Sequence, residues 1–200
     1  MIQGLDPSTD GPGIQRQVRA RHPTFRHALV ADARITARHR GEREHFRSGA
    51  DAAIQVLRLM WESDAFLAQA LYRLKARLQA RGVPVLPRLL HRVSIALAQV
   101  SIGDPVVVHP GLYLIHGHVV IDGIVEIHPG VIVSPFVTIG LRSGNFVGPT
   151  IERDVNIGTG AKVIGPVRVG VGAEIGANAV VVDDVPDGAT VVGSPARPVS

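Results

Sequence analysis

The chain has 200 residues, enough for one large hydrophobic core or two small ones, and its lack of cysteine excludes disulfides, thiolate metal sites and a cysteine acyl-enzyme. Its net charge of +4 attracts anions, but no basic run is interleaved with aromatic residues, so we expect a small phosphorylated ligand and no nucleic acid. Neither an export signal nor an apolar run of membrane-spanning length occurs in the sequence, which favours a cytoplasmic protein without a membrane partner.

The first half of the chain predicts helices after a flexible start. Residues 1–13 are rich in proline, glycine and polar side chains, and we expect them to form a flexible leader. A charged helix is expected over 24–46. The clearest helical pattern covers 51–81, where apolar residues recur at spacings of three and four, and Ser63 is a candidate cap for a second helix start inside it.

A short further helix is expected over 89–97, after a break that Pro84 and Pro87 mark. Glycine is concentrated after residue 100, so we expect a helical domain over 14–100 and a different domain over 101–200. The large side chains that are expected to pack between helices are Met60, Trp61 and Phe66.

The second half of the chain repeats every six residues. A β-branched aliphatic residue recurs at each sixth position, and a small or aliphatic residue stands two positions before the next one. The first set is Ile151, Ile157, Val163, Val169, Ile175 and Val181, and the second is Val155, Ala161, Val167, Ala173, Ala179 and Val185. Three such hexads make a triangular coil of about eighteen residues, and coils stack at a strand spacing of about 4.8 Å. The repeat predicts a left-handed parallel β-helix over 101–200 and therefore an α+β chain.

Two irregularities interrupt this repeat. The unit 114–120 has seven residues instead of six and contains two histidines, and bulges of this kind often occur at functional sites. The segment 141–150 lacks an aliphatic residue at position 145. It predicts a loop that projects from a coil and borders a ligand cleft.

The nine histidines differ in their context. His109 and His128 each precede Pro-Gly at a corner of a predicted coil, and a packing or solvent-facing role is expected for both. His116 and His118 flank Gly117 in the seven-residue unit, and alternation puts both side chains on one face if the segment is extended. Three interpretations stay open for this pair: a general base, a metal site or a polar surface. Because a His-x-His pair brings two ligands without an evident third, no metal is expected.

Five segments carry a resemblance to a known protein family. They are Ala-Leu-Tyr-Arg at 70–73, Gly-Leu-Tyr-Leu-Ile-His at 111–116, Val-Thr-Ile-Gly at 137–140, Ile-Gly-Thr-Gly-Ala-Lys-Val-Ile-Gly at 157–165 and Val-Gly-Ser-Pro-Ala-Arg at 192–197. In these segments the chain resembles the bacterial serine acetyltransferases of the hexapeptide-repeat superfamily. The last two segments are common in hexapeptide acyltransferases. A helical domain that leads into a coil ending in Leu-x-His is the more specific feature.

The resemblance implies transfer of an acetyl group from acetyl-CoA to the hydroxyl of L-serine, the serine-acetylating step of cysteine biosynthesis. It implies His116 as the general base, a role that suits histidine because a serine hydroxyl is a poor nucleophile until a base takes its proton. It also implies a site between the subunits of a homotrimer or of a dimer of trimers. The coenzyme-binding positions that it implies are Gly140, Thr159, Lys162, Ala177 and Arg197.

The chain departs from the family around the expected acceptor pocket. With His116 as the point of alignment, four positions differ. They are Ser101 and Ile115 in place of carboxylates, Gly123 in place of a glutamate and Gly148 in place of a second histidine. These changes indicate an acceptor pocket that is built differently from the pocket of the family.

A general base needs a partner that orients it, and Asp104 or Asp122 is expected to replace the missing carboxylate and to contact His116. Both aspartates also suit plain turns, because Asp104 precedes proline and Asp122 precedes glycine. Three alternatives to a serine acetyltransferase stay open: a hexapeptide acyltransferase for another hydroxyl or amine acceptor, a metal-dependent β-helix enzyme of the carbonic anhydrase type, and a non-catalytic β-helix scaffold.

Overall fold

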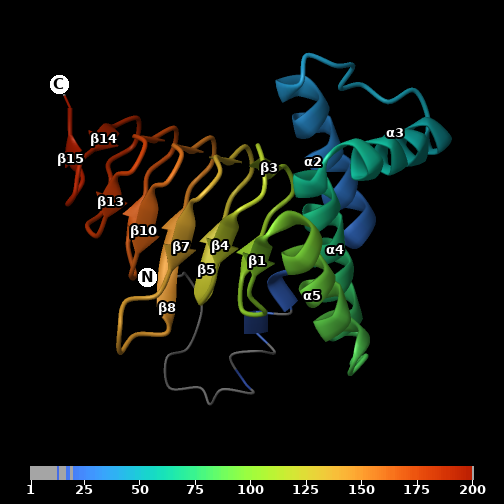
Figure 1. Cartoon of the computed structure of the whole chain (residues 1–200), viewed down its shortest axis with the longest axis horizontal. Coiled ribbons are helices and arrows are strands. Elements are labelled where there is room, and N and C mark those ends of the chain that lie inside the picture. Colours follow the sequence, from blue (N-terminus) through green and yellow to red (C-terminus); the bar gives the residue numbers. More distant parts are fainter. Residues whose placement is uncertain (1–12, 14–16, 19, 200) are drawn as a thin grey trace.

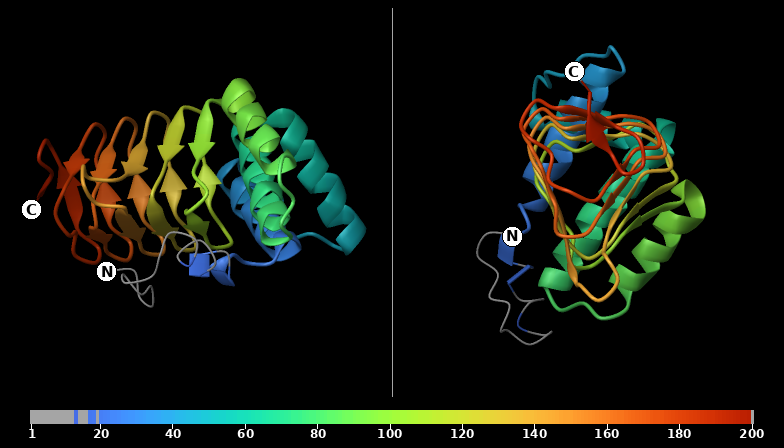
Figure 2. Two further views of the ribbon diagram at one scale, coloured as in Figure 1. Left: turned by 90° about the horizontal axis from the view of Figure 1, so that it is seen from below. Right: turned by 90° about the vertical axis from the view of Figure 1, so that its left-hand side faces the viewer.

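A computed structural model describes residues 13, 17–18 and 20–199. The flexible leader expected over 1–13 therefore lies outside the described residues, except for Gly13. Figure 1 shows helices gathered at one end of a long parallel β-solenoid, and the left panel of Figure 2 shows the same division from below. The helices are α2 (Phe25–His39), α3 (Gly49–Glu62), α4 (Asp64–Ala80) and α5 (Leu86–Ala98).

The helix boundaries follow local capping chemistry and correct several predictions. Helix α2 ends at His39 and not near residue 46, because Gly41 takes a left-handed φ of 72° after the Arg40 cap. The predicted helix over 51–81 is divided at Ser63, whose hydroxyl accepts a hydrogen bond from the backbone N–H of Phe66. Helix α5 begins at Leu86, so Pro87 lies in its first turn, where a missing N–H leaves no partner unsatisfied.

The large side chains of α3 and α4 divide between the core and the surface. Phe66 is fully buried, and Met60 packs against the same small helical cluster, as expected. Trp61 is 90% exposed, so its predicted place between helices is wrong. Trp61 forms an exposed apolar row on α3 with Ile54 and Leu57, because residues spaced by three and four share one face of a helix. We call these three residues the α3 row.

Three parallel sheets form the sides of the solenoid, and the end-on view in Figure 2 shows its triangular outline. Sheet A contains β1 (Val100–Ile102), β4 (Val119–Ile121), β7 (Thr138–Gly140), β10 (Lys162–Ile164) and β13 (Val180–Val181). Sheet B contains β2 (Val107–Val108), β5 (Ile124–Ile127), β8 (Val147–Ile151) and β11 (Arg168–Val169). Sheet C contains β3 (Tyr113–Leu114), β6 (Ile132–Val133), β9 (Asn156–Ile157), β12 (Glu174–Ile175), β14 (Thr190–Val192) and the antiparallel β15 (Arg197–Pro198).

The hexad residues fill the core of this solenoid. All twelve residues of the two predicted sets are buried, and they belong to one continuous hydrophobic cluster. Small side chains alternate with larger ones because each triangular coil must fill its interior at close-packed density. The left-handed parallel β-helix behind a helical domain, expected from the six-residue repeat, is confirmed.

Strand register confirms the extra residue in the unit 114–120. Val100 pairs with Val119, one residue further along the chain than in the next coil, where Val120 pairs with Thr138. The predicted loop at 141–150 is shorter than expected, because residues 147–151 form β8 and pair with β5. The residues that project between β7 and β8 are therefore 141–146, and this loop is visible beside β8 in Figure 1.

Helix α4 covers the open end of the solenoid with polar side chains. The first coil has no preceding coil to pair with, so its backbone carbonyls need other donors. Gln69 donates to the carbonyl of Leu112, and the hydroxyl of Tyr72 donates to that of Val106, both at 2.8 Å. Lys75 donates to the carbonyl of Ile102 at 2.6 Å.

A buried ion pair completes this end of the solenoid. Arg73 of α4 pairs with Asp32 of α2 at 2.8 Å and also donates to the carbonyls of Val108 and His109. Asp32 in turn accepts from the backbone N–H of Gly111 at 2.8 Å. The helices and the first coil are therefore joined by hydrogen bonds as well as by apolar contacts.

Candidate active site

His116 lies at the corner between β3 and β4, and its side chain is exposed. Gly117 next to it passes so close to the end of α5 that a Cβ would stand 1.9 Å from the carbonyl oxygen of Ala98. His118 has a left-handed φ of 61°, and its ring stacks on that of Phe136 with centroids 4.7 Å apart. The segment is therefore bent, and the extended arrangement that would place both histidines on one strand face does not form.

Two expected coenzyme positions lie on the same edge of the solenoid as His116. We call the line of corners between sheet C and sheet A the C–A edge. It runs past 115–118, 134–137, 158–161 and 176–179. Thr159 and Ala177 lie at its third and fourth corners, and the N–H of Asn178 donates to the carbonyl of Thr159 at 2.9 Å. Gly158 allows this close stacking, because a Cβ there would stand 2.7 Å from the backbone N of Ala177.

The two basic coenzyme candidates already have partners within the chain. Lys162 at the start of β10 donates to the carbonyl of Phe136 at 2.6 Å, which places its side chain along the C–A edge. Arg197 lies in β15, at the far end of the solenoid, and its exposed guanidinium pairs with Asp183 at 3.1 Å. An exposed ion pair of this kind contributes little to stability, so its arginine is free to exchange partners.

Gly140, Asp104 and Asp122 lie on a different edge of the solenoid. We call the line of corners between sheet A and sheet B the A–B edge; the loop 141–146 projects from it. The backbone N–H of Asp122 donates to the carbonyl of Ile139. Gly140 lies at the end of β7, and a Cβ added there would stand 3.8 Å from the carbonyl oxygen of Asp122. The width of sheet A therefore separates these residues from His116 within one chain.

Asp104 is engaged by a lysine of the helical cap. Its Oδ1 lies 3.0 Å from the Nζ of Lys75, whose side chain is buried. Burial lowers the pKa of Lys75, whereas the pKa of Asp104 is lowered because hydrogen bonds from Gln79 and Lys75 outweigh its own burial. In the described residues, no hydrogen bond or ion pair joins His116 to Asp104 or to Asp122. Which carboxylate orients His116 stays a prediction.

Gly123 and Gly148, where the resemblance implies a glutamate and a histidine in the family, are closely packed. Gly123 has a left-handed φ of 96°, and a Cβ there would stand 2.1 Å from the Cδ2 of Leu141. At Gly148 a Cβ would stand 2.6 Å from the Cγ2 of Val125. Neither position accepts a larger side chain unless a neighbouring side chain moves.

One polar cluster was missed by the sequence analysis. His109 and His128 do lie at coil corners, but their rings stack on each other and both approach the buried carboxylate of Glu126. The signal in the sequence is two His-Pro-Gly units one enlarged coil apart. Among the described residues, the group suited to hold a metal ion is this cluster, and it includes neither His116 nor His118.

The buried hexads and the three parallel sheets define a hexapeptide-repeat β-helix protein with a helical cap. Within the described residues, no helix combines the length and the apolar character needed to cross a membrane. No family model matches the chain.

Curated relatives match about two thirds of the chain. A serine acetyltransferase of Helicobacter pylori is 38% identical over 133 residues, which are 64% of this chain and 77% of that protein. A serine acetyltransferase of Bacillus subtilis is 40% identical over 130 residues, 63% of this chain and 59% of that protein. The chain belongs to the serine acetyltransferase family, whose members are acyltransferase enzymes.

Solved structures extend the similarity to the helical cap. Serine acetyltransferase from Brucella abortus matches 92% of this chain and 72% of that chain, with a TM-score of 0.73 and 26% identity. A serine acetyltransferase complex with CoA matches 93% and 74%, with a TM-score of 0.73 and 27% identity. The Neisseria gonorrhoeae enzyme in complex with serine matches 96% and 78%, with a TM-score of 0.61 and 25% identity.

Proposed function

We propose that this protein transfers the acetyl group of acetyl-CoA directly to the hydroxyl of L-serine, giving O-acetylserine and coenzyme A. The observation that carries this proposal is the C–A edge, where the exposed His116 stands in line with Thr159 and Ala177. The family relatives and the solved complexes with CoA and with serine support the same chemistry.

In this mechanism His116 is the general base. A ring nitrogen takes the proton of the serine hydroxyl while the oxygen attacks the thioester carbon of acetyl-CoA. The tetrahedral intermediate then breaks its carbon–sulfur bond, and the proton held by His116 passes to the leaving thiolate. Because the chain has no cysteine, a thiol acyl-enzyme cannot form, which favours direct transfer from the coenzyme to the acceptor.

The C–A edge offers a track for the donor. Thr159 and Ala177 lie two and three coils beyond His116, which corresponds to about 10 and 14 Å along the solenoid. A thread-like pantetheine arm spans such distances, and the small side chains at these corners let it approach the backbone. We assign Lys162, which lies beside this track in the coil of Thr159, and Arg197, at the far end of the solenoid, to the phosphates of the coenzyme, since both are cations that can exchange their present partners.

The active site that we propose is shared between subunits of a homotrimer. A threefold ring joins two different patches of each chain, one from each side of the interface. The C–A edge with His116 is one patch. The A–B edge with Gly140, Asp122 and the loop 141–146 is the other, and Asp122 of the neighbouring chain is then the carboxylate that orients His116. Asp104 is the weaker candidate because Lys75 already holds it.

We further propose that two trimers join through the α3 row. The exposed fractions of the α3 row are 61% for Ile54, 66% for Leu57 and 90% for Trp61. A contiguous apolar patch of this kind on a helix surface is typical of a protein–protein contact. Replacing Trp61 and Leu57 by Gln is expected to convert a hexamer into a folded trimer, as measured by sedimentation velocity. An unchanged hexamer would place the contact elsewhere, and an original particle of trimer size would remove the proposal.

Another hydroxyl or amine compound is the second candidate for the acceptor. The close packing at Gly123 and Gly148 favours it, because the family residues that line the pocket have no room at these positions. The compartment that we propose is the cytoplasm, where acetyl-CoA is available to such an enzyme.

The test is release of free coenzyme A from acetyl-CoA, first with L-serine and then with a panel of hydroxyl and amino compounds. His116→Ala is expected to lower kcat by about 100-fold or more, because the base is lost while the coenzyme track is retained. His118→Ala is the neighbouring control and should retain most of the activity. Turnover on another compound alone would replace the acceptor, and no turnover by the folded native protein would remove the proposal.

A further inference from the structure

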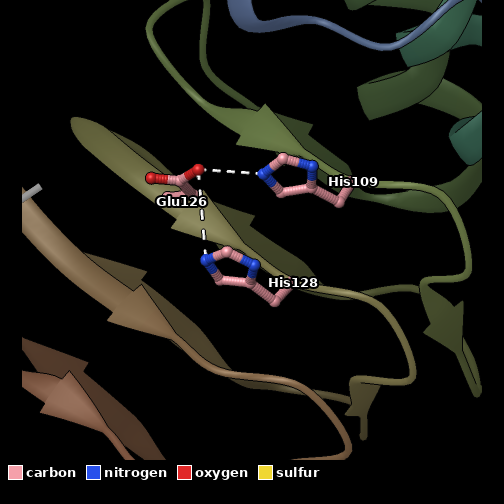
Figure 3. A group of neighbouring side chains, drawn as sticks. All are labelled: His109, Glu126 and His128. Atoms are coloured by element: carbon pink, nitrogen blue, oxygen red, sulfur yellow. Dashed lines mark hydrogen bonds and ion pairs between the residues drawn. The ribbon is translucent and has the colours of Figure 1, made fainter. Parts of the chain in front are cut away.

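Three side chains with metal-binding atoms meet on the outer face of sheet B, away from both edges that carry the proposed active site. Glu126 belongs to β5, and His128 follows that strand two residues later, so both point outward on the same face. Val108 pairs with Ile127, which brings His109 alongside His128 on the neighbouring coil. Figure 3 shows the three side chains together, with both imidazoles turned toward the Glu126 carboxylate.

The two rings are arranged in parallel and address one oxygen atom. Their centroids are 4.8 Å apart and their planes differ by 13°. Nε2 of His109 lies 2.8 Å from Oε1 of Glu126, and Nε2 of His128 lies 4.0 Å from the same oxygen. One ligand atom from each residue falls within 4.8 Å of the others. Donor atoms around a tetrahedral zinc ion are about 3.3 Å apart, so atomic shifts of up to about 1.5 Å, which small side-chain rotations supply, complete the site.

The pKa values of two of these groups are shifted by their surroundings. Burial alone would raise the pKa of Glu126, but its hydrogen bond with His109 and the charge of Arg21 outweigh burial and lower it. Burial and the neighbouring His109 lower the pKa of His128. At neutral pH the carboxylate is therefore ionised and the imidazole of His128 neutral, which are the forms that bind metal ions.

Arg21 occupies the other carboxylate oxygen. Its guanidinium donates to Oε2 of Glu126 at 2.6 Å, which orients the carboxylate and leaves Oε1 directed at the two histidines. A partner that holds the second oxygen of a ligand in this way is common around protein metal sites. The side chains of His109 and His128 remain 29 and 32% exposed, so an ion can enter from solvent.

We propose that His109, Glu126 and His128 bind one divalent transition-metal ion, with Zn²⁺ the best match to two imidazole nitrogens and one carboxylate oxygen. This ion fastens the first coil to the second, because its ligands come from both. Three protein ligands leave one position of a tetrahedral ion for water. The site departs from our expectation of a metal-free protein, and it is independent of the acetyl transfer proposed at His116.

The experiment titrates Co²⁺ into the metal-stripped full-length protein, prepared without a histidine tag, and records visible absorption and calorimetric stoichiometry. We expect one Co²⁺ per chain, the strong visible bands of four-coordinate cobalt, and displacement by Zn²⁺. His109→Gln and His128→Gln should each weaken Co²⁺ binding by at least about 100-fold. His45→Gln is the matched control, because the side chain of His45 is 93% exposed and lies outside the cluster.

Equal affinity in all three histidine variants would overturn the proposal, as would the absence of stoichiometric binding by the native protein. A second measurement needs no variant, so it decides the matter even if the substitutions prevent folding. Crystals grown with Zn²⁺ should give an anomalous difference peak between the three side chains at the zinc absorption edge. A map without this peak, or with zinc only at other residues, contradicts the site.

Discussion

Gly123 and Gly148 determine which side chains can surround the expected acceptor pocket. Gly123 has a left-handed backbone, and it also packs closely against the side chain of Leu141. Both effects oppose a side chain, one through backbone strain and the other through overlap with a packed neighbour. A side chain at Gly123 therefore requires both a strained backbone and a shift of Leu141.

Gly123→Ala is expected to lower the free energy of unfolding by about 2–4 kcal/mol, because it meets both the strain and the overlap. Gly144→Ala is the matched control. Its φ of 80° carries similar strain, but no atom lies within 4 Å of the added Cβ, so a loss of only about 1–2 kcal/mol is expected. Urea unfolding followed by circular dichroism measures the difference, and equal losses would show that Leu141 can move aside.

At the scale of elements, α4 works as a lid for the first coil. An uncovered coil would expose a row of unpaired carbonyls, and such edges recruit other chains. Gln69, Tyr72 and Lys75 satisfy three of these carbonyls, and each comes from the face of α4 that rests on the solenoid. The helical cap and the β-helix are therefore expected to unfold together.

Tyr72→Phe removes the hydroxyl that donates a hydrogen bond to the carbonyl of Val106. The expected loss is about 1–3 kcal/mol, because a buried acceptor then lacks a partner while the ring still packs. Thermal unfolding should show a lower midpoint and a single transition. Two separate transitions would contradict joint unfolding of the cap and the solenoid.

At the scale of the whole molecule, the proposed pairing of His116 with Asp122 requires more than one chain. His116 lies on the C–A edge and Asp122 on the A–B edge, so the proposed site would take its base and its orienting group from different subunits. A heterologous trimer interface joins two different surface patches, so it can bring the C–A edge of one chain against the A–B edge of the next.

Mixed trimers test this arrangement. His116→Ala and Asp122→Asn are expected to be nearly inactive alone, whereas a refolded equal mixture should recover about a quarter of native activity, since some interfaces then join two intact residues. Asp104→Asn serves as the comparison, because loss of the Lys75 pair should lower stability more than activity. A mixture as inactive as its components would place both residues of a site in one chain.

The stability of the whole molecule should also depend on pH through His22. Burial, with the nearby charges of Arg73 and Lys75, lowers the pKa of His22 from 6.5 to about 4. Between these values the unfolded chain binds a proton that the folded protein does not, so stability is complete above pH 6.5 and falls as the pH drops toward 4. The loss from this residue reaches at most about 3 kcal/mol.

His22→Gln removes the titrating group and should flatten the decline in unfolding free energy between pH 6.5 and 4. Urea midpoints across this range measure the slope in both proteins. If the variant declines as steeply as the native chain, other groups are responsible for the acid sensitivity.

The six-residue repeat could be recognised without a structure because each hexad packs against the equivalent hexad of the neighbouring coil. Ile157, Val163 and Ile175 are buried for the same reason, because each faces the interior of its coil. The same regularity made the extra residue in 114–120 and the loop after Gly140 visible as departures.

The helical cap was harder to predict, because its faces are chosen by what they meet. Trp61 and Phe66 look alike in a helical pattern, yet one is exposed and the other buried. The capping roles of Gln69 and Tyr72 depend on carbonyls that are 34 to 43 residues away in the chain.

By itself, the sequence determined the β-helix, the order of helices and solenoid, and the resemblance that singles out His116, because periodicity and motifs are local properties. Only the tertiary structure decided that Asp104 pairs with Lys75, that His116 and Asp122 lie on different edges, and that His109, Glu126 and His128 converge. These results depend on which coils and helices become neighbours, and spatial neighbours are set by stacking and closure of the whole chain.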